Sequence, residues 1–69
     1  MSTRNRLKYW RHQHGMNQKE FAEYLMQPYH HYTRWDGNVV QPSVKKLVDM
    51  WKVIKKRFPD TNLQDLLEL

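Results

Sequence analysis

Two short amphipathic segments separated by a brief break constrain the fold of this chain more than any other feature. The first covers residues 17–25 and the second residues 28–36, with Met26-Gln27 between them. Apolar side chains recur at helical spacing in both segments. The pattern predicts two helices joined by a tight turn, a helix-turn-helix over about residues 17–36. The expected inward positions are Phe21, Ala22 and Leu25 in the first, and Tyr32 and Trp35 in the second.

Local signals mark the ends of these two helices. Asn17 followed by Glu20 predicts a capping box, in which each side chain satisfies a backbone donor of the first turn. Pro28 is expected to open the second helix, where its missing N–H costs nothing. Gly37-Asn38 is expected to end that helix.

The rest of the chain also follows a helical period. A first helix is expected over about residues 4–13, ended by Gly15, and a long fourth helix from Pro42 to Phe58. Thr61 with Gln64 predicts another capping box before a short fifth helix. The sequence therefore predicts an all-α fold of five helices in a single domain, residues 1–69. The expected inward positions of the fourth helix are Val44, Leu47, Val48, Trp51, Ile54 and Phe58.

The chain is basic, and its charge is unevenly distributed. Its formal net charge is +5 at pH 7. Residues 1–34 hold six Lys and Arg against two Glu, a balance of +4, whereas residues 35–69 hold six against five, a balance of +1. A basic half of a small domain favours a polyanionic partner.

Composition also excludes several classes of protein. The chain has no cysteine, which excludes disulfides and cysteine-based zinc sites. Its longest apolar runs, such as Val39-Val40, are two residues, so no membrane span is expected. The basic N-terminus is not followed by an apolar stretch and does not predict a signal peptide. We therefore expect a cytoplasmic protein.

Several short motifs follow one another in a particular order and spacing along residues 5–69. They are Arg6-Leu7, Gly15-Met16-Asn17-Gln18, Glu20-Phe21-Ala22, Arg34-Trp35-Asp36 followed by Gly and Asn, Gln41-Pro42-Ser43, and Asn62-Leu63-Gln64-Asp65-Leu66-Leu67. In this combination they resemble the lambda-repressor-like (XRE/Cro) helix-turn-helix family of bacterial and phage DNA-binding proteins. The resemblance implies a five-helix domain that binds double-stranded DNA through its second and third helices, usually as a dimer.

The resemblance also implies a set of DNA contacts. Gln18, at the start of the second helix, would contact a backbone phosphate. The first turn of the third helix would meet base edges, and the loop after that helix would approach phosphates on the far side. The DNA-binding residues implied in this way are Asn17, Gln18, Pro28, Tyr29, His30, Thr33, Arg34 and Asn38.

The chain departs from the family pattern at two positions. The family favours Gly at the turn between the second and third helices, where this chain has Met26. The backbone at Met26 must therefore avoid or tolerate a left-handed conformation, which is costly for a residue with a Cβ atom, and we expect a slightly altered turn. The usual Asn-Gly after the third helix is inverted to Gly37-Asn38, a mild change because Asn accepts positive φ.

Each candidate side chain has a definite chemistry and an alternative. Arg34 can donate two hydrogen bonds to guanine, or it can be a solvated helix residue. Tyr29 can contact DNA or pack against the turn. His30-His31 and His12-x-His14 do not predict a metal site, because no carboxylate or thiol joins them at ligand spacing. No cofactor, small-molecule ligand or catalytic constellation is predicted, so we do not expect an enzyme.

One ion pair is expected between the first and third helices. In the expected fold the first helix crosses the end of the third, which brings Arg11 near Asp36. Such a partly buried pair would brace the third helix rather than add much net stability.

The sequence therefore predicts a sequence-specific DNA-binding transcriptional regulator, a small repressor of the phage or mobile-element type that binds an operator. Dimerisation is expected through the fifth helix, with Leu66 and Leu69 as the candidate interface. Two alternatives remain open. One is a protein-interaction module, antitoxin-like or adaptor, on the same fold, and the other is a non-specific DNA-binding protein.

Overall fold

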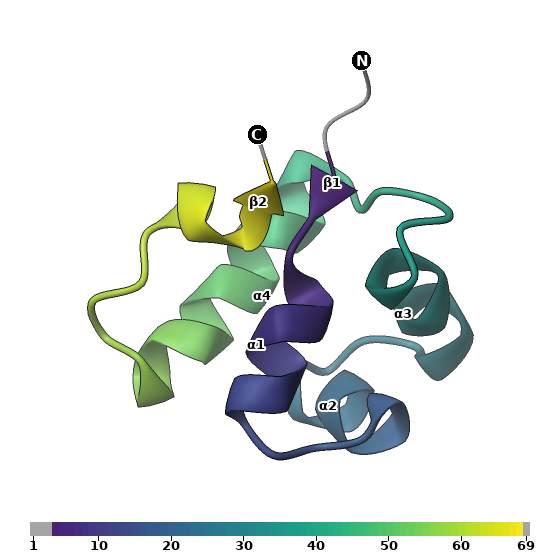
Figure 1. Ribbon diagram of the computed structural model, residues 1–69, viewed down its shortest axis with the longest axis horizontal. Helices are drawn as coiled ribbons and strands as arrows, with labels where there is room; N and C mark the ends of the chain where they lie inside the picture. The colour runs from purple at the N-terminus through teal and green to yellow at the C-terminus, as the bar shows by residue number, and fades with distance from the viewer. Residues whose placement is uncertain (1–3, 69) are drawn as a thin grey trace.

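The computed structural model describes residues 4–68 of the 69-residue chain. Within this range the elements are four α-helices, one 3₁₀ helix and two short strands (Figure 1). Most of the described residues are helical, as expected, but the all-α class with five α-helices is not what the structure shows. In chain order the elements are β1 (Arg4–Asn5), α1 (Leu7–Gln13), α2 (Gln18–Tyr24), α3 (Tyr29–Asp36), α4 (Val44–Arg57), η1 (Leu63–Leu66) and β2 (Leu67–Glu68).

The ends of α1 and α2 follow the local signals in the sequence. Gly15, after α1, has φ +66°, a conformation that costs glycine little. The Asn17 side chain accepts a hydrogen bond from the Glu20 backbone at 2.8 Å, and the Glu20 carboxylate accepts one from the Asn17 backbone at 2.9 Å. The predicted capping box at the start of α2 is therefore confirmed.

Helix α3 begins one residue later than expected. Pro28 is the N-cap, with an extended backbone, and its carbonyl oxygen accepts the first hydrogen bond of the helix from Tyr32 at 2.9 Å. Gly37 ends α3 with φ −84°, and the left-handed residue is Asn38 at φ +58°. The asparagine therefore takes the strained position that the inverted order assigned to it.

The N-terminal segment is extended where a helix was expected. Asn5 pairs with Leu67 and Arg4 with Glu68 in an antiparallel pair of strands. The Asn5 side chain then accepts a hydrogen bond from the Leu7 backbone at 3.0 Å, so α1 begins at Leu7 rather than near residue 4.

Up to residue 68, the C-terminal segment contains no fifth α-helix. The capping box is formed by Asn62 and Asp65 rather than by Thr61 and Gln64, and the turn that follows is a 3₁₀ helix. The chain cannot continue as a helix because β2 pairs with β1, and the Leu66 carbonyl accepts a hydrogen bond from Arg6 at 2.7 Å.

The expected dimer interface changes with this segment. Leu66 is fully buried in the core of its own chain, so its side chain has no surface to offer to a second copy. That part of the prediction is wrong. Leu69, the other candidate interface residue, lies outside the described residues.

Helix α4 is long, but its buried face differs from the expected one. It begins at Val44 with Ser43 as N-cap, two residues after Pro42. Val44 is 72% exposed, whereas Met50, which was not expected to face inward, is fully buried. The buried line Leu47, Met50 and Ile54 is rotated relative to the predicted one.

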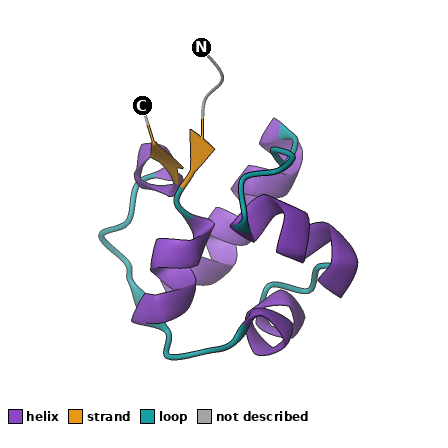
Figure 2. Ribbon diagram, turned by 45° about the vertical axis from the view of Figure 1, so that its right-hand side comes forward, coloured by secondary structure: helices purple, strands orange, loops and turns teal. Residues whose placement is uncertain are grey.

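The core lies where all four helices and η1 meet (Figures 1 and 2). In Figure 1, α3 lies at the right-hand side and η1 at the left, with α1 between them. No helix among residues 4–68 is long and apolar enough to cross a membrane. The core residues are Leu7, Phe21, Ala22, Leu25, Tyr32, Trp35, Leu47, Met50, Ile54 and Leu66.

Candidate nucleic-acid interface

Helix α3 has a buried side and a side turned to solvent. Tyr32, Trp35 and Asp36 are buried on its inner side. His30 and Arg34, four residues apart and therefore on one face, are exposed. Helix α3 thus presents a polar, partly cationic face away from the core. The outer side, over which a partner would pass, consists of Tyr29, His30, His31, Thr33, Arg34 and Gly37.

The side chains on this outer face differ in how much hydrogen-bonding capacity they retain. The Thr33 hydroxyl donates to the His30 carbonyl at 3.0 Å, which leaves its methyl group and an acceptor lone pair. The rings of His30 and His31 contact edge to face, 4.6 Å apart. Among residues 4–68, the Arg34 guanidinium has neither a hydrogen bond nor an ion pair. All five of its donors are therefore available to a partner.

Tyr29 stands at the first position of α3 and is 51% exposed. Pro28 precedes it and is exposed as well. The structure therefore brings both predicted residues to the solvent side of the turn, beside His30.

The turn before α3 shows how the chain accommodates Met26. Its backbone adopts φ +60°, the left-handed conformation that glycine takes more easily. Gln27 donates to the Ala22 carbonyl at 2.9 Å and Met26 to the Glu23 carbonyl at 3.0 Å, a pattern that closes the end of α2. The expected alteration of the turn is not observed, since Met26 simply adopts the strained conformation.

The Asp36 carboxylate, at the end of α3, joins three helices. Arg11 of α1 donates to its Oδ1 at 2.9 Å, and the Tyr32 hydroxyl donates to the same oxygen at 2.9 Å. Gln18 of α2 donates to Oδ2 at 3.1 Å. The Arg11 and Asp36 side chains are only 12% and 3% exposed. The ion pair predicted between α1 and α3 is therefore confirmed, with two further donors.

This network sets the protonation states of its members. Burial by itself raises the pKa of the Asp36 carboxyl, but the hydrogen bonds from Arg11, Gln18 and Tyr32 outweigh it, so that pKa lies below its ordinary value. The hydrogen bond to Asp36 raises the pKa of Arg11. Burial, and then the negative charge of Asp36, raise the pKa of the Tyr32 hydroxyl. The network is thus a carboxylate, a guanidinium and a neutral phenol.

Two of the predicted DNA-binding residues, Asn17 and Gln18, lie at the start of α2. One hydrogen of the Gln18 amide is donated to Asp36, which leaves the second for a partner. The side-chain oxygen Oδ1 of Asn17 accepts the hydrogen bond of the capping box, whereas its side-chain NH₂ group has no hydrogen bond within the described residues. Each side chain therefore retains a donor while it has a structural role.

Asn38 has a structural role that the sequence did not reveal. Its Oδ1 accepts hydrogen bonds from the Asn5 backbone at 2.8 Å and from the Gln41 amide at 3.0 Å, and its Nδ2 donates to the Asn5 carbonyl at 3.2 Å. The Asn5 side chain in turn donates to the Trp35 carbonyl at 2.8 Å and to Gln41 at 2.9 Å. This clamp holds β1 against the end of α3. Asn5 and Asn38 are 33 residues apart in the chain, so no local sequence pattern predicts the clamp.

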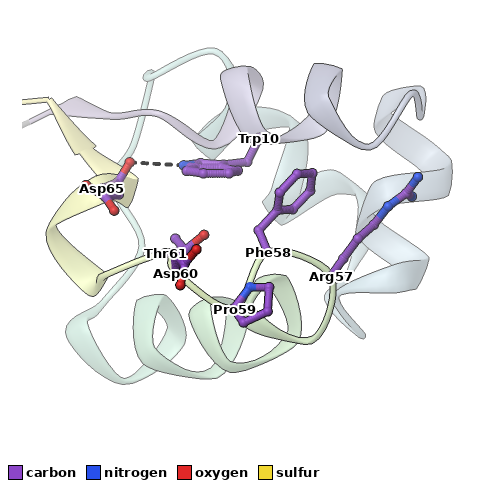
Figure 3. Close-up of a pocket in the computed structure, with 7 residues that line it drawn as sticks. All are labelled: Trp10, Arg57, Phe58, Pro59, Asp60, Thr61 and Asp65. Atoms are coloured by element: carbon purple, nitrogen blue, oxygen red, sulfur yellow. Dashed lines mark hydrogen bonds between the residues drawn. The ribbon is translucent and has the colours of Figure 1, made fainter.

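On the other side of α1 a hollow of about 300 Å³ lies between α1, the end of α4 and η1 (Figure 3). Its walls include the Trp10 and Phe58 rings, which meet edge to face at 5.5 Å. The Trp10 indole N–H donates to the Asp65 carbonyl at 3.0 Å, which ties η1 to α1. The hollow is separate from the outer face of α3 and contains none of the predicted site residues.

His14, a member of the His12-x-His14 pair, lies inside the protein. His14 is buried among the rings of Phe21, Tyr24 and Phe58, and its Nδ1 lies 2.6 Å from the Trp10 carbonyl. It is therefore a core residue. Across residues 4–68, no three His, Cys, Asp or Glu side chains are arranged to hold a metal ion.

Comparison with protein-family models gives no match, and comparisons with curated proteins and with solved structures give none either.

Proposed function

We propose that this protein is a helix-turn-helix regulator that binds a specific site on double-stranded DNA through α3, in the manner of the lambda-repressor-like family. The observation that carries the proposal is the two-sided character of α3. Tyr32, Trp35 and Asp36 anchor its inner side, while His30 and Arg34 face solvent. A helix of eight residues is about 12 Å long, comparable with the width of the major groove.

The outer side chains have the chemistry to read base edges. Arg34, with its donors free, is suited to the O6 and N7 acceptors of guanine, a contact worth roughly 1–3 kcal/mol of discrimination. His30 and Tyr29 can donate to a purine acceptor or pack against a thymine methyl. The methyl group of Thr33 is suited to the same apolar contact.

Phosphate contacts would fix the position of α3 in the groove. Asn17 and Gln18 each retain an amide donor, and such contacts position a protein without reading sequence. Asn38 contributes differently from the expected phosphate contact, because its side chain is used within the clamp. It orients the loop after α3 rather than contacting phosphate through its amide.

Regulation would follow from occupancy of an operator, so we propose a repressor that acts in the cytoplasm. A homodimer would place two α3 helices about 34–36 Å apart on one side of the duplex, and its site would be palindromic. Because Leu66 is buried, the dimer contact must use other residues than this one.

The experiment is selection of bound sequences from a random duplex pool, followed by mobility shifts with the selected and a random duplex. We expect a palindromic site and tight binding of the selected duplex. Arg34→Ala should weaken the selected duplex by about 10-fold or more and random duplex far less. Arg57→Ala, which removes the same charge from the end of α4, is the matched control and should change both duplexes little.

The two alternatives give different results in this experiment. A non-specific DNA-binding protein would show salt-dependent binding with no selected sequence. A protein-interaction module would bind neither duplex at low salt. Equal loss of both duplexes in Arg34→Ala would remove Arg34 from the base-reading residues.

A further inference from the structure

We propose that a basic groove beside α3 holds the phosphate backbone of the same duplex and extends the bound site beyond the bases that α3 reads. This inference rests on the proposed function. The groove, called here the β1–α1 groove, is a hollow of about 440 Å³. Its lining includes Arg4, Arg6, Lys8 and His12 from the N-terminal part of the chain, together with Gly37 and Asn38 at the end of α3.

The charge of the groove favours a polyanion. Arg4, Arg6 and Lys8 carry three permanent positive charges, and none of them forms an ion pair within residues 4–68. Two carboxylates also border the hollow. Asp36 is neutralised by Arg11 at 2.9 Å, so Glu68 is the one uncompensated negative charge among the lining residues.

The cationic side chains are attached to a backbone that is fixed relative to α3. The clamp of Asn5, Asn38 and Gln41 joins the strand that carries Arg4 to the loop after α3. The Arg6 guanidinium lies over the Tyr9 ring, 4.4 Å from its centre, which restrains it without using its N–H donors. Little further ordering of the backbone is then needed when a ligand binds.

The position of the groove points to the duplex rather than to a separate ligand. Gly37 follows Arg34 by three residues, so the groove adjoins the outer face of α3 at its C-terminal end. A duplex whose major groove receives α3 carries a phosphate strand along each side of that groove. Arginine forms bidentate hydrogen bonds with phosphate, so Arg4 and Arg6 have suitable chemistry for this strand.

The test compares two pairs of substitutions that remove the same charge. Arg4→Gln with Lys8→Gln alters two exposed groove side chains that make no hydrogen bond within the described residues. Lys52→Gln with Lys56→Gln alters two exposed side chains on the later turns of α4 and is the matched control. Binding of the selected duplex is measured between about 50 and about 200 mM salt, a range over which phosphate contacts change the affinity strongly, together with thermal unfolding of each variant.

The slope of log K against log salt is negative, and loss of two phosphate contacts should make it shallower by about 1.8 and weaken binding at the lowest salt by at least about 10-fold. The control pair should leave the slope unchanged. The charge-conserving pair Arg4→Lys with Lys8→Arg should restore the wild-type slope, a result that a purely structural role would not give.

Equal slopes for the groove pair and the control pair would overturn the inference. If Arg34→Ala still weakened the selected duplex in that case, the proposed function would stand without the groove. If the wild-type protein bound no duplex, the proposed function and the groove contact would both be wrong.

Discussion

The buried pair of Arg11 and Asp36 gives the sharpest test of how α3 is held. Replacing one partner alone leaves a charge that is almost completely removed from water, because the two side chains are 12% and 3% exposed. Loss of one member of such a pair costs about 3–5 kcal/mol. A domain of this length has roughly 3–10 kcal/mol of total stability. Arg11→Met and Asp36→Leu should therefore each bring the protein close to unfolding.

The double variant should be more stable than the sum of the two losses indicates. It leaves no unpaired charge, and its main remaining cost is the buried Tyr32 hydroxyl, which loses its acceptor, at about 1–3 kcal/mol. The Gln18 amide also loses its acceptor, but this residue is only partly buried. We therefore expect the double variant to cost at least about 2 kcal/mol less than the two single variants together. Urea unfolding, followed by tryptophan fluorescence and by circular dichroism, measures all four corners of the cycle.

A safeguard is needed because the single variants are expected to be marginal. If either is unfolded without urea, the cycle is repeated in a Met26→Gly background, which shifts all four proteins equally. Additive losses, with a coupling below about 0.5 kcal/mol, would show that the ion pair does not act as a unit and would refute the reasoning.

Two further predictions follow from the backbone and from the pKa shifts. Met26 is 84% exposed and has φ +60°, so Met26→Gly should relieve backbone strain with little loss of buried surface. We expect it to stabilise the fold by about 0.5–1 kcal/mol, measured as a higher Tm. Met26→Ala retains the Cβ atom and should not stabilise, so equal gains in the two variants would contradict this account. Because the pKa of Asp36 is lowered in the folded state, its contribution is present above the unfolded value near 3.9 and declines as pH falls below it. Because the pKa of Tyr32 is raised, its contribution is present below about pH 10 and declines above it. Urea unfolding at a series of pH values measures the free energy of unfolding on the acid and on the alkaline side. Tyr32→Phe, which has no ionisable hydroxyl, should reduce the loss of stability on the alkaline side.

The parts of the fold that could be predicted from the sequence are those determined by residues close together in the chain, within about one helical turn. The capping box of Asn17 and Glu20 and the stop at Gly15 each depend on neighbours within three residues or on one residue's own conformation. Tyr32 and Trp35 were correctly placed inward because α3 is short, and an error in helical phase has little length over which to accumulate.

The parts that were wrong depend on distant partners. The C-terminal segment has helical spacing, but its end is decided by pairing of Leu67 with Asn5, from opposite ends of the chain. The clamp on Asn38 depends on the same strand. In α4, Val44 and Met50 exchange their expected environments because the neighbouring elements, not the apolar period, determine which side of a long helix is covered. The exposure of the candidate site residues on α3 was easier to predict, since it follows from the buried positions between them.

Asp36 connects the stability of this domain to its proposed function although it does not face the partner. One carboxylate receives donors from α1, from α2 and from α3 itself, so the orientation of the outer face of α3 relative to Gln18 is fixed when the chain folds. The clamp of Asn5 and Asn38 fixes the other end of α3 relative to the β1–α1 groove. Surfaces that are ordered before binding do not lose that freedom when a ligand arrives. The groups proposed to read bases and to bind phosphate are therefore held in register by two polar networks, one at Asp36 and one at Asn5 and Asn38.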